Sequence, residues 1–329
     1  MGVASPLGDH LMLSSLAHSL LCLHHLKRNL LTLLCLSMLS MAAEAELRVV
    51  IIEGLGGEPA YQKQFDKEAT AIQVASASIT RAEQVSRLTG AAATRANIMA
   101  VMKQCASSLN KEDRLALYLI GHGSYDGYTY KFNLPGADIT GAELVSMLNA
   151  VKADNQLIVV TGSASGALQV LLKKDSRIVV TATRNGNERN ITQFGQYFAD
   201  ALMDANADSD KNGRISVQEA LDMTARKVKD YYEAESRLAT EHPQLTGLHA
   251  GVFNISELPG EHTSVTTANA SLLAQREQLT GQIDELRLRK ESLAEDMYLQ
   301  QLEVLLLQLA ELDARIDTQS GQATTEAAP

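Results

Sequence analysis

One histidine in the sequence stands where it could transfer protons. The stretch LALYLIGHGSYDG, residues 115–127, runs from an apolar segment into Gly121, His122 and Gly123. An imidazole gains and loses a proton near neutral pH, so it can act as a general acid or base. The flanking glycines carry no side chain that could shield it. We therefore interpret His122 as a residue that lines a site, although a lone histidine can also be purely structural.

A second candidate for chemistry follows the next apolar segment. QLIVVT (156–161) leads into the small-residue turn TGSASG (161–166). Ser163 in this turn could be a nucleophile if a base lay beside it. The turn does not match the G-x-S-x-G nucleophile elbow. A tight strand-to-helix turn built from small residues is the alternative interpretation.

The strongest single motif is DSDKNGRISVQE, residues 208–219. It has the spacing of an EF-hand-like loop, which curls oxygen ligands around one hard cation and uses a glycine at its sixth position for the sharp turn. The predicted Ca²⁺ ligands are Asp208, Asp210, Asn212, the carbonyl of Arg214, Ser216 and a bidentate Glu219. The alternative is a solvated acidic turn that caps the next helix. A single loop predicts a structural ion rather than a paired calcium sensor.

The elements that must position these residues alternate along the chain. Apolar segments typical of buried strands lie at 47–54, 114–120, 156–161 and 177–183, and helical stretches lie at about 59–75, 93–109, 138–151 and 191–205. The segment 84–88 could be either. This order predicts an α/β fold with a mostly parallel sheet covered on both faces. Chemistry in such sheets gathers at the carboxyl ends of the strands, where His122 and Ser163 both fall.

These residues carry a resemblance to the caspase-like peptidases, most nearly to the legumain (asparaginyl endopeptidase) branch. GHGSYDG is similar to that family's His-Gly loop, and TGSASGA looks like its Ala-Cys-x-Ser-Gly turn. The likeness spans about residues 47–256, and YKFNLPGADIT and RLATEHPQL look like bacterial members with a similar calcium loop. It implies a caspase-like three-layer sandwich, with His122 as the catalytic histidine. It also implies an oxyanion hole made by the backbone N–H groups of Gly123 and Ser163.

The departure from the family is Ser163, which stands where the family has its nucleophilic Cys. A thiol ionises readily beside an imidazole, whereas an alcohol needs a base that a third group orients. Asp126 and Asp138 are candidates for that third group only by their proximity in sequence. We therefore favour a protein with a degenerate dyad that binds peptides or protein partners. The alternatives are an active Ser/His peptide hydrolase and a non-enzymatic scaffold.

The N-terminal segment, residues 1–45, has the features of a signal peptide. Lys27 and Arg28 precede a short apolar run that ends in Ala43-Glu44-Ala45. We expect a periplasmic or secreted protein whose mature chain begins near Glu46 and is not held in a membrane, with an uncleaved anchor as the alternative. N-terminal sequencing of the exported protein tests this. Cys105 would be the one cysteine left after cleavage, so we expect a buried free thiol and no intramolecular disulfide.

The net charge and the C-terminal sequence pattern bear on possible partners. The 329-residue chain has a net charge of −10, which argues against nucleic acid as the main partner. A caspase/legumain-like domain at 46–258 would be followed by a linker at 259–269. Heptad-like apolar spacing at 270–317 predicts a coiled-coil hairpin that turns near 289–293, or a single bent helix, and offers a surface for a partner or for self-association. We expect the tail at 318–329 to be disordered.

Overall fold

The computed structural model describes residues 45–259 and 267–326. The predicted signal peptide, apart from Ala45, and the middle of the predicted linker lie outside these ranges. The described residues form an α/β domain followed by a pair of long helices.

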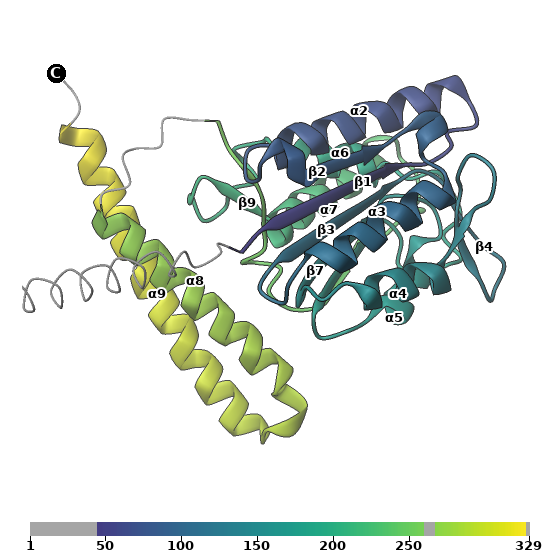
Figure 1. The fold of residues 1–329 in the computed structure, drawn as a ribbon. Helices are drawn as coiled ribbons and strands as arrows, with labels where there is room; N and C mark the ends of the chain where they lie inside the picture. The colour runs from purple at the N-terminus through teal and green to yellow at the C-terminus, as the bar shows by residue number, and fades with distance from the viewer. Residues whose placement is uncertain (1–44, 260–266, 327–329) are drawn as a thin grey trace, which may run out of the picture. The chain divides into compact units, whose positions relative to one another are not determined.

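A six-stranded sheet in the order β10-β8-β7-β3-β1-β2 forms the centre of the domain (Figure 1). Its strands are β1 (Leu47–Glu53), β2 (Val85–Leu88), β3 (Arg114–Ile120), β7 (Asn155–Val160), β8 (Arg177–Thr181) and β10 (Gln244–Thr246). All neighbours pair in parallel except β10, which runs antiparallel to β8. The ambiguous segment 84–88 becomes the edge strand β2. The predicted mostly parallel sheet is confirmed.

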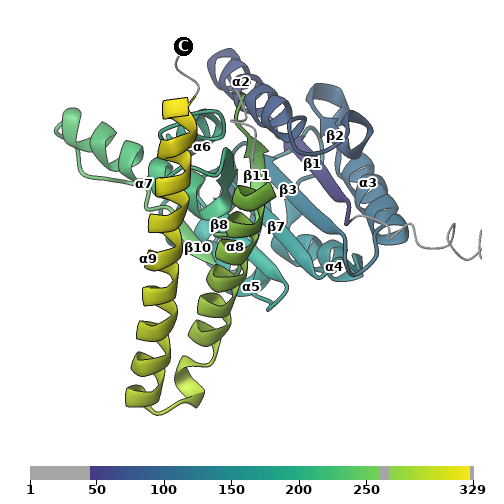
Figure 2. The ribbon, with the colours of Figure 1, turned by 90° about the vertical axis from the view of Figure 1, so that its left-hand side faces the viewer.

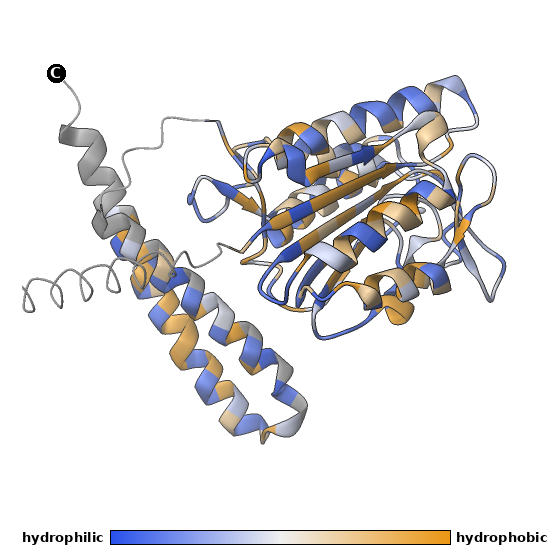
Figure 3. Cartoon of the chain, in the orientation of Figure 1, coloured by the Kyte–Doolittle hydropathy of each residue, from blue (hydrophilic) through white to orange (hydrophobic). Residues whose placement is uncertain are grey.

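Helices cover both faces of the sheet and make the predicted three-layer sandwich. One face is covered by α2 (Pro59–Ser76), α6 (Phe194–Ala201) and α7 (Val217–Ala234), and the other by α3 (Arg95–Ser108), α4 (Gly141–Ala150) and α5 (Leu168–Leu172). The hydropathy colouring shows apolar central strands and helices with one polar and one apolar side (Figure 3).

The central strands consist of unbroken runs of apolar residues because both faces of each strand are buried. In β1, Val49 and Ile51 pack into the core under α2, whereas Val50 and Ile52 pack into the core under α3. Each of the four is at most 1% exposed. Burying one such side chain is worth about 1.5–3 kcal/mol, so the two cores together hold the sheet rigid. Cys105 lies buried in the α3 core as a free thiol, as expected.

Several short elements connect the longer strands and helices. They are β4 (Gly123–Tyr125), β5 (Tyr130–Phe132), β6 (Ile139–Thr140), β9 (Arg214–Ser216), β11 (Asn254–Glu257) and the 3₁₀ turns η1 (Ala82–Gln84), η2 (Gly90–Ala92), η3 (Ser165–Ala167) and η4 (Lys290–Ser292). The first three strands form a small antiparallel sheet directly after His122. It leads into α4, which begins with a capping box between Thr140 and Glu143. Strands of two or three residues are too short to show periodicity, so the sequence does not predict them.

The C-terminal helices α8 (Thr267–Leu288) and α9 (Glu295–Glu326) form the predicted hairpin (Figure 2). Leu272, Leu279, Leu312 and Ile316 pack between them. The predicted disordered tail is wrong for residues 318–326, because extending an existing helix needs no new nucleus and Thr318 donates a hydrogen bond to the carbonyl of Ala314. In the described residues, no helix combines the length and the apolar character that crossing a membrane requires.

A buried carboxyl group lies between α2 and α6. Glu68 on α2 is 3% exposed and accepts a hydrogen bond from Gln64 Nε2 at 2.9 Å. It packs against Gly195, where an added Cβ would lie 2.3 Å from Glu68 Oε2. Burial raises the pKa of Glu68 to about 7, the hydrogen bond from Gln64 opposes this rise, and the nearby charge of Asp200 adds to it.

The raised pKa predicts that the domain loses stability as pH rises. The folded state holds the proton of Glu68 more tightly than the unfolded state does. The protonated carboxyl therefore contributes fully to the free energy of unfolding below about pH 4.5, and this contribution is lost as pH passes about 7. Glu68→Gln should flatten this dependence and stabilise the protein at pH 8 by up to about 3 kcal/mol. Urea unfolding between pH 5 and pH 8 measures it. Glu58→Gln, at an exposed carboxylate, is the control, and equal pH slopes for wild type and Glu68→Gln would contradict the prediction.

Candidate functional site

The turns after β3 and β7 touch each other. The two strands pair in parallel, and Thr161 N–H continues the ladder to the carbonyl of Leu119 at 3.0 Å. An added Cβ on Gly162 would lie 2.1 Å from the carbonyl oxygen of Gly121, and one on Gly123 would lie 2.5 Å from that of Ser163. The backbone at His122 and the backbone at Ser163 are therefore neighbours, as the strand order predicts.

His122 is held by the start of α2 and by the loop before it. Tyr61 and Phe65 contact its ring edge-on, with ring centroids 5.2 and 5.0 Å away. Its Nε2 lies 3.2 Å from the carbonyl oxygen of Gly56. Because a carbonyl can only accept, this contact assigns the proton of the neutral ring to Nε2 and leaves Nδ1 as an acceptor.

Among the hydrogen bonds of the described residues, none joins His122 to Asp126 or Asp138, the two carboxylates close to it in sequence. Asp126 accepts the backbone N–H groups of Tyr128 and Thr129 in its own turn. Asp138 accepts the N–H of Leu134. These two candidates, which were named only for their proximity in sequence, use their carboxylates in local turns instead. A backbone acceptor fills that position, and it carries no side-chain signature that the sequence could reveal.

Ser163 is hydrogen-bonded to Asn190 rather than to His122. Its side chain is almost buried, at 5% exposure, and its Oγ donates to the carbonyl of Asn190 at 2.8 Å. The next residue, Ala164, has a left-handed backbone with φ +56°, and its N–H donates to the carbonyl of Glu188 at 2.8 Å. Among the hydrogen bonds of these two described residues, none joins Ser163 to His122. The serine turn is thus anchored to the loop at 182–193.

That loop is fixed by a segment far along the chain. Glu241 is 1% exposed and accepts the N–H groups of Gln193 and Phe194 at 2.7 and 3.0 Å. Burial raises the pKa of Glu241, and these backbone hydrogen bonds oppose the rise. His242 Nδ1 lies 2.6 Å from Glu188 Oε1. Neither anchor could be predicted from the sequence, because the partners lie 47 to 54 residues apart.

The family comparison agrees with this geometry. The sequence model of the peptidase C13 family matches residues 33–245, which is more than half of the chain and includes both turns. The chain belongs to the peptidase C13 family. The match supports the caspase-like legumain branch that the motifs resemble, and with it the peptidase fold.

Two further comparisons add little to the peptidase C13 assignment. No curated protein matches the chain. The crystal structure of a protein from Geobacter sulfurreducens is similar, with 14% sequence identity and a TM-score of 0.43, and the likeness covers 65% of this chain and 98% of that one.

In this C13-family chain, the segment predicted to bind Ca²⁺ forms an acidic loop between α6 and α7. Asp208, Asp210 and Glu219 each offer an oxygen, and these atoms lie within 4.8 Å of one another. Gly213, at the sixth position, has φ +78°, as the sharp turn requires. Burial, together with the charge of Glu219, raises the pKa of Asp210 to about 7, although the guanidinium of Arg276 on α8, which pairs with Asp210, opposes the rise.

The three other predicted ligands make local hydrogen bonds. Asn212 Oδ1 accepts the N–H of Arg214 at 2.7 Å. Ser216 caps α7 in a capping box with Glu219. The structure therefore brings the three predicted carboxylate ligands together and shows part of the helix-capping alternative as well. Three oxygen donors around one point suit a hard cation such as Ca²⁺.

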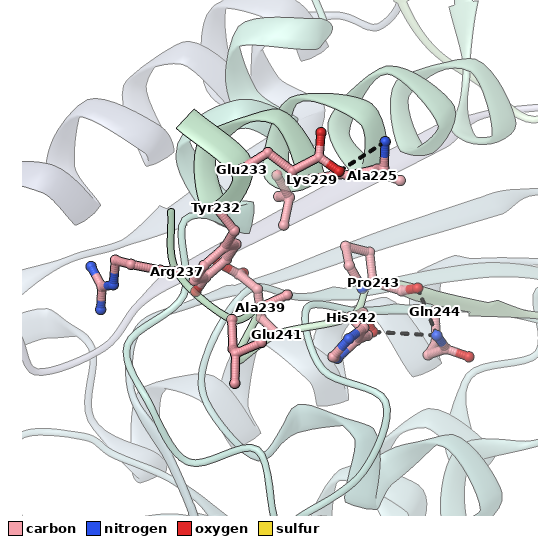
Figure 4. Close-up of a pocket in the computed structure, with 12 residues that line it drawn as sticks. Ala225, Lys229, Tyr232, Glu233, Arg237, Ala239, Glu241, His242, Pro243 and Gln244 are labelled. Carbon is pink, nitrogen blue, oxygen red and sulfur yellow. Dashed lines mark hydrogen bonds and ion pairs between the residues drawn. The ribbon is translucent and has the colours of Figure 1, made fainter. Parts of the chain in front are cut away.

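A pocket of about 490 Å³ lies beside the loop that anchors Ser163 (Figure 4). The C-terminal part of α7 lines it with Tyr232 and Glu233, and the following segment lines it with Arg237 and His242. His242 connects the pocket to the site, because it pairs with Glu188, whose carbonyl holds the serine turn.

Proposed function

We propose that this C13-family protein is exported and binds peptide or protein segments at the rim between His122 and Ser163 without cleaving them efficiently. The hydrogen bond from Ser163 Oγ to the carbonyl of Asn190 carries the proposal. A backbone carbonyl cannot act as a general base. The hydroxyl of Ser163 is therefore hydrogen-bonded to a group that cannot remove its proton, rather than to the imidazole of His122, which could.

The chemistry of the side chain points the same way. Attack on a peptide carbonyl needs an oxygen or sulfur nucleophile that loses its proton as the new bond forms. A thiol, with a pKa near 8.5, supplies some thiolate before the reaction begins, whereas a serine hydroxyl supplies none. The remaining parts fit the family's design. They are an imidazole oriented by the Gly56 carbonyl and two adjacent residues, Gly123 and Ser163, whose N–H groups would stabilise an oxyanion.

The first test restores the thiol. Ser163→Cys should react with an alkylating peptide probe at least tenfold faster than a free thiol of ordinary pKa, because the imidazole of His122 would draw its proton. Adding His122→Ala should abolish the gain. Cys105 is buried and serves as the internal control in mass spectra of the labelled protein. Equal labelling with and without His122 would contradict the proposal.

We also propose that Ca²⁺ binds Asp208, Asp210 and Glu219 and stabilises the end of the domain. Asp208 is 6% and Glu219 is 8% exposed, so their charges repel in a poorly solvated place unless a cation lies between them. Bound Ca²⁺ would compete with Arg276 for Asp210.

Calcium should therefore raise the melting temperature. At about a hundred times the dissociation constant the gain is about 2.7 kcal/mol, or roughly 5 °C or more for a domain of this size. Glu219→Gln should remove most of it. Asp222→Asn, at a neighbouring acidic position on α7 outside the cluster, should keep it. Identical melting curves with calcium and with chelator would exclude the site.

The hairpin supports a second candidate function, as a scaffold that self-associates. A stripe of apolar side chains on one face of α9 stays about half exposed: Leu299 and Leu306 lie one heptad apart, whereas Met297 and Val304 lie on the opposite side of the helix. This stripe is separate from Leu312 and Ile316, which pack against α8. A second copy of the same stripe would cover it with matched knobs and holes.

The stripe predicts dimers that dissociate when it is made polar. Leu299→Ser with Leu306→Ser should shift the protein to monomer in sedimentation equilibrium across a dilution series. Gln308→Ser, at an exposed polar position of the same helix, should leave the mass unchanged. Wild-type protein that is monomeric throughout would contradict self-association and leave peptide binding at the rim unaffected.

A further inference from the structure

A buried carboxylate stands two hydrogen bonds away from the loop that orients His122. Glu53 is the last residue of β1 and is 1% exposed. Its Oε1 accepts from Gln62 Nε2 at 2.5 Å. Its Oε2 accepts from Thr89 Oγ1 at 2.7 Å and from Arg87 Nη2 at 3.1 Å. Three short contacts to one buried carboxylate are more than a structural ion pair with Arg87 alone would need, and the contact with Gln62 leads toward the site.

Gln62 carries the connection onward. Its Oε1 accepts the N–H of Gly56 at 3.0 Å while its Nε2 donates to Glu53. Glu53 can only accept, so it fixes which way the amide of Gln62 is turned. That orientation in turn presents Oε1 to Gly56. On the far side of the same residue, the carbonyl of Gly56 contacts His122 Nε2 at 3.2 Å.

The loop needs such a restraint because it is rich in glycine. Gly57 has φ +75°, a conformation that glycine enters and leaves freely. Gly56 also lies too close to α2 for a side chain, since an added Cβ would be 2.6 Å from the N of Gln62. The N–H of Glu58 also donates to the Gly56 carbonyl at 2.8 Å, and the hydrogen bond from the Gly56 N–H to Gln62 adds the side-chain restraint on the same residue.

We propose that Glu53 is a positioning residue that acts through Gln62 and Gly56 to hold the Nε2 proton of His122. The inference rests on the proposed function in taking His122 as the imidazole of the site. Glu53 does not touch substrate. It fixes the amide of Gln62, the amide fixes the Gly56 peptide, and the peptide fixes the ring tautomer that leaves Nδ1 as the proton acceptor.

The test observes the ring proton itself in the Ser163 protein, by NMR on isotope-labelled histidine. Wild type should show a protected Nε2–H signal for His122, assigned by its absence in His122→Ala. Gln62→Met keeps the volume of the side chain and removes both hydrogen bonds. It should speed exchange of this proton at least tenfold, so the signal weakens or disappears.

The matched control is Thr89→Val, which deletes a hydrogen bond of similar length to the other oxygen of the same carboxylate. It should leave the signal unchanged. An unaltered exchange rate in Gln62→Met, loss of the signal in both variants, or a wild-type ring protonated at Nδ1 would each overturn the proposal. None of these results depends on the reactivity of residue 163, so failure here is distinct from failure of the proposed function.

Discussion

The close approach of two backbone turns at the carboxyl edge of the sheet is the constraint on which the rest of the site depends. Because β3 and β7 pair in parallel and in register, they deliver His122 and Ser163 to the same point. The approach is so tight that Gly121, Gly123 and Gly162 meet with no room for a Cβ at two of the three positions. The geometry of the family's site therefore follows from strand pairing and small residues, whatever nucleophile the chain carries.

Strand pairing places His122 and Ser163 beside each other, but it does not decide whether Ser163 can react. The imidazole packs against Tyr61 and Phe65, and its Nε2 faces the carbonyl of Gly56. This arrangement orients the ring and leaves Nδ1 as the proton acceptor. The serine on the opposite turn is turned to Asn190 instead. A rigid, nearly buried hydroxyl with a satisfied hydrogen bond costs about 0.5–1.5 kcal/mol to free before any chemistry begins. On the proposed function, the site has the shape of a peptidase site without a nucleophile that is ready to react.

Much of the fold could be predicted because it rests on strong local patterns. Four apolar strands, a capping box at Thr140 and the acidic loop at 208–219 each appear in a short window of sequence, and strand order then places His122 beside Ser163. The anchors of the site could not be predicted. Gly56 and Asn190 act through backbone carbonyls, which every residue possesses, and Glu241 reaches Gln193 only after the chain has folded. The helical tail was missed because its polar composition resembles that of disordered segments.

The central claim is that Ser163 is a bound, unreactive hydroxyl in a peptidase-shaped site. Treatment of the wild-type protein with a fluorophosphonate probe, followed by intact-protein mass spectrometry, tests it most directly, because such probes modify activated serines and leave ordinary hydroxyls untouched. The account predicts no added mass at Ser163, with or without calcium. Labelling of the wild type that disappears in Ser163→Ala and in His122→Ala would show an activated serine and contradict the account.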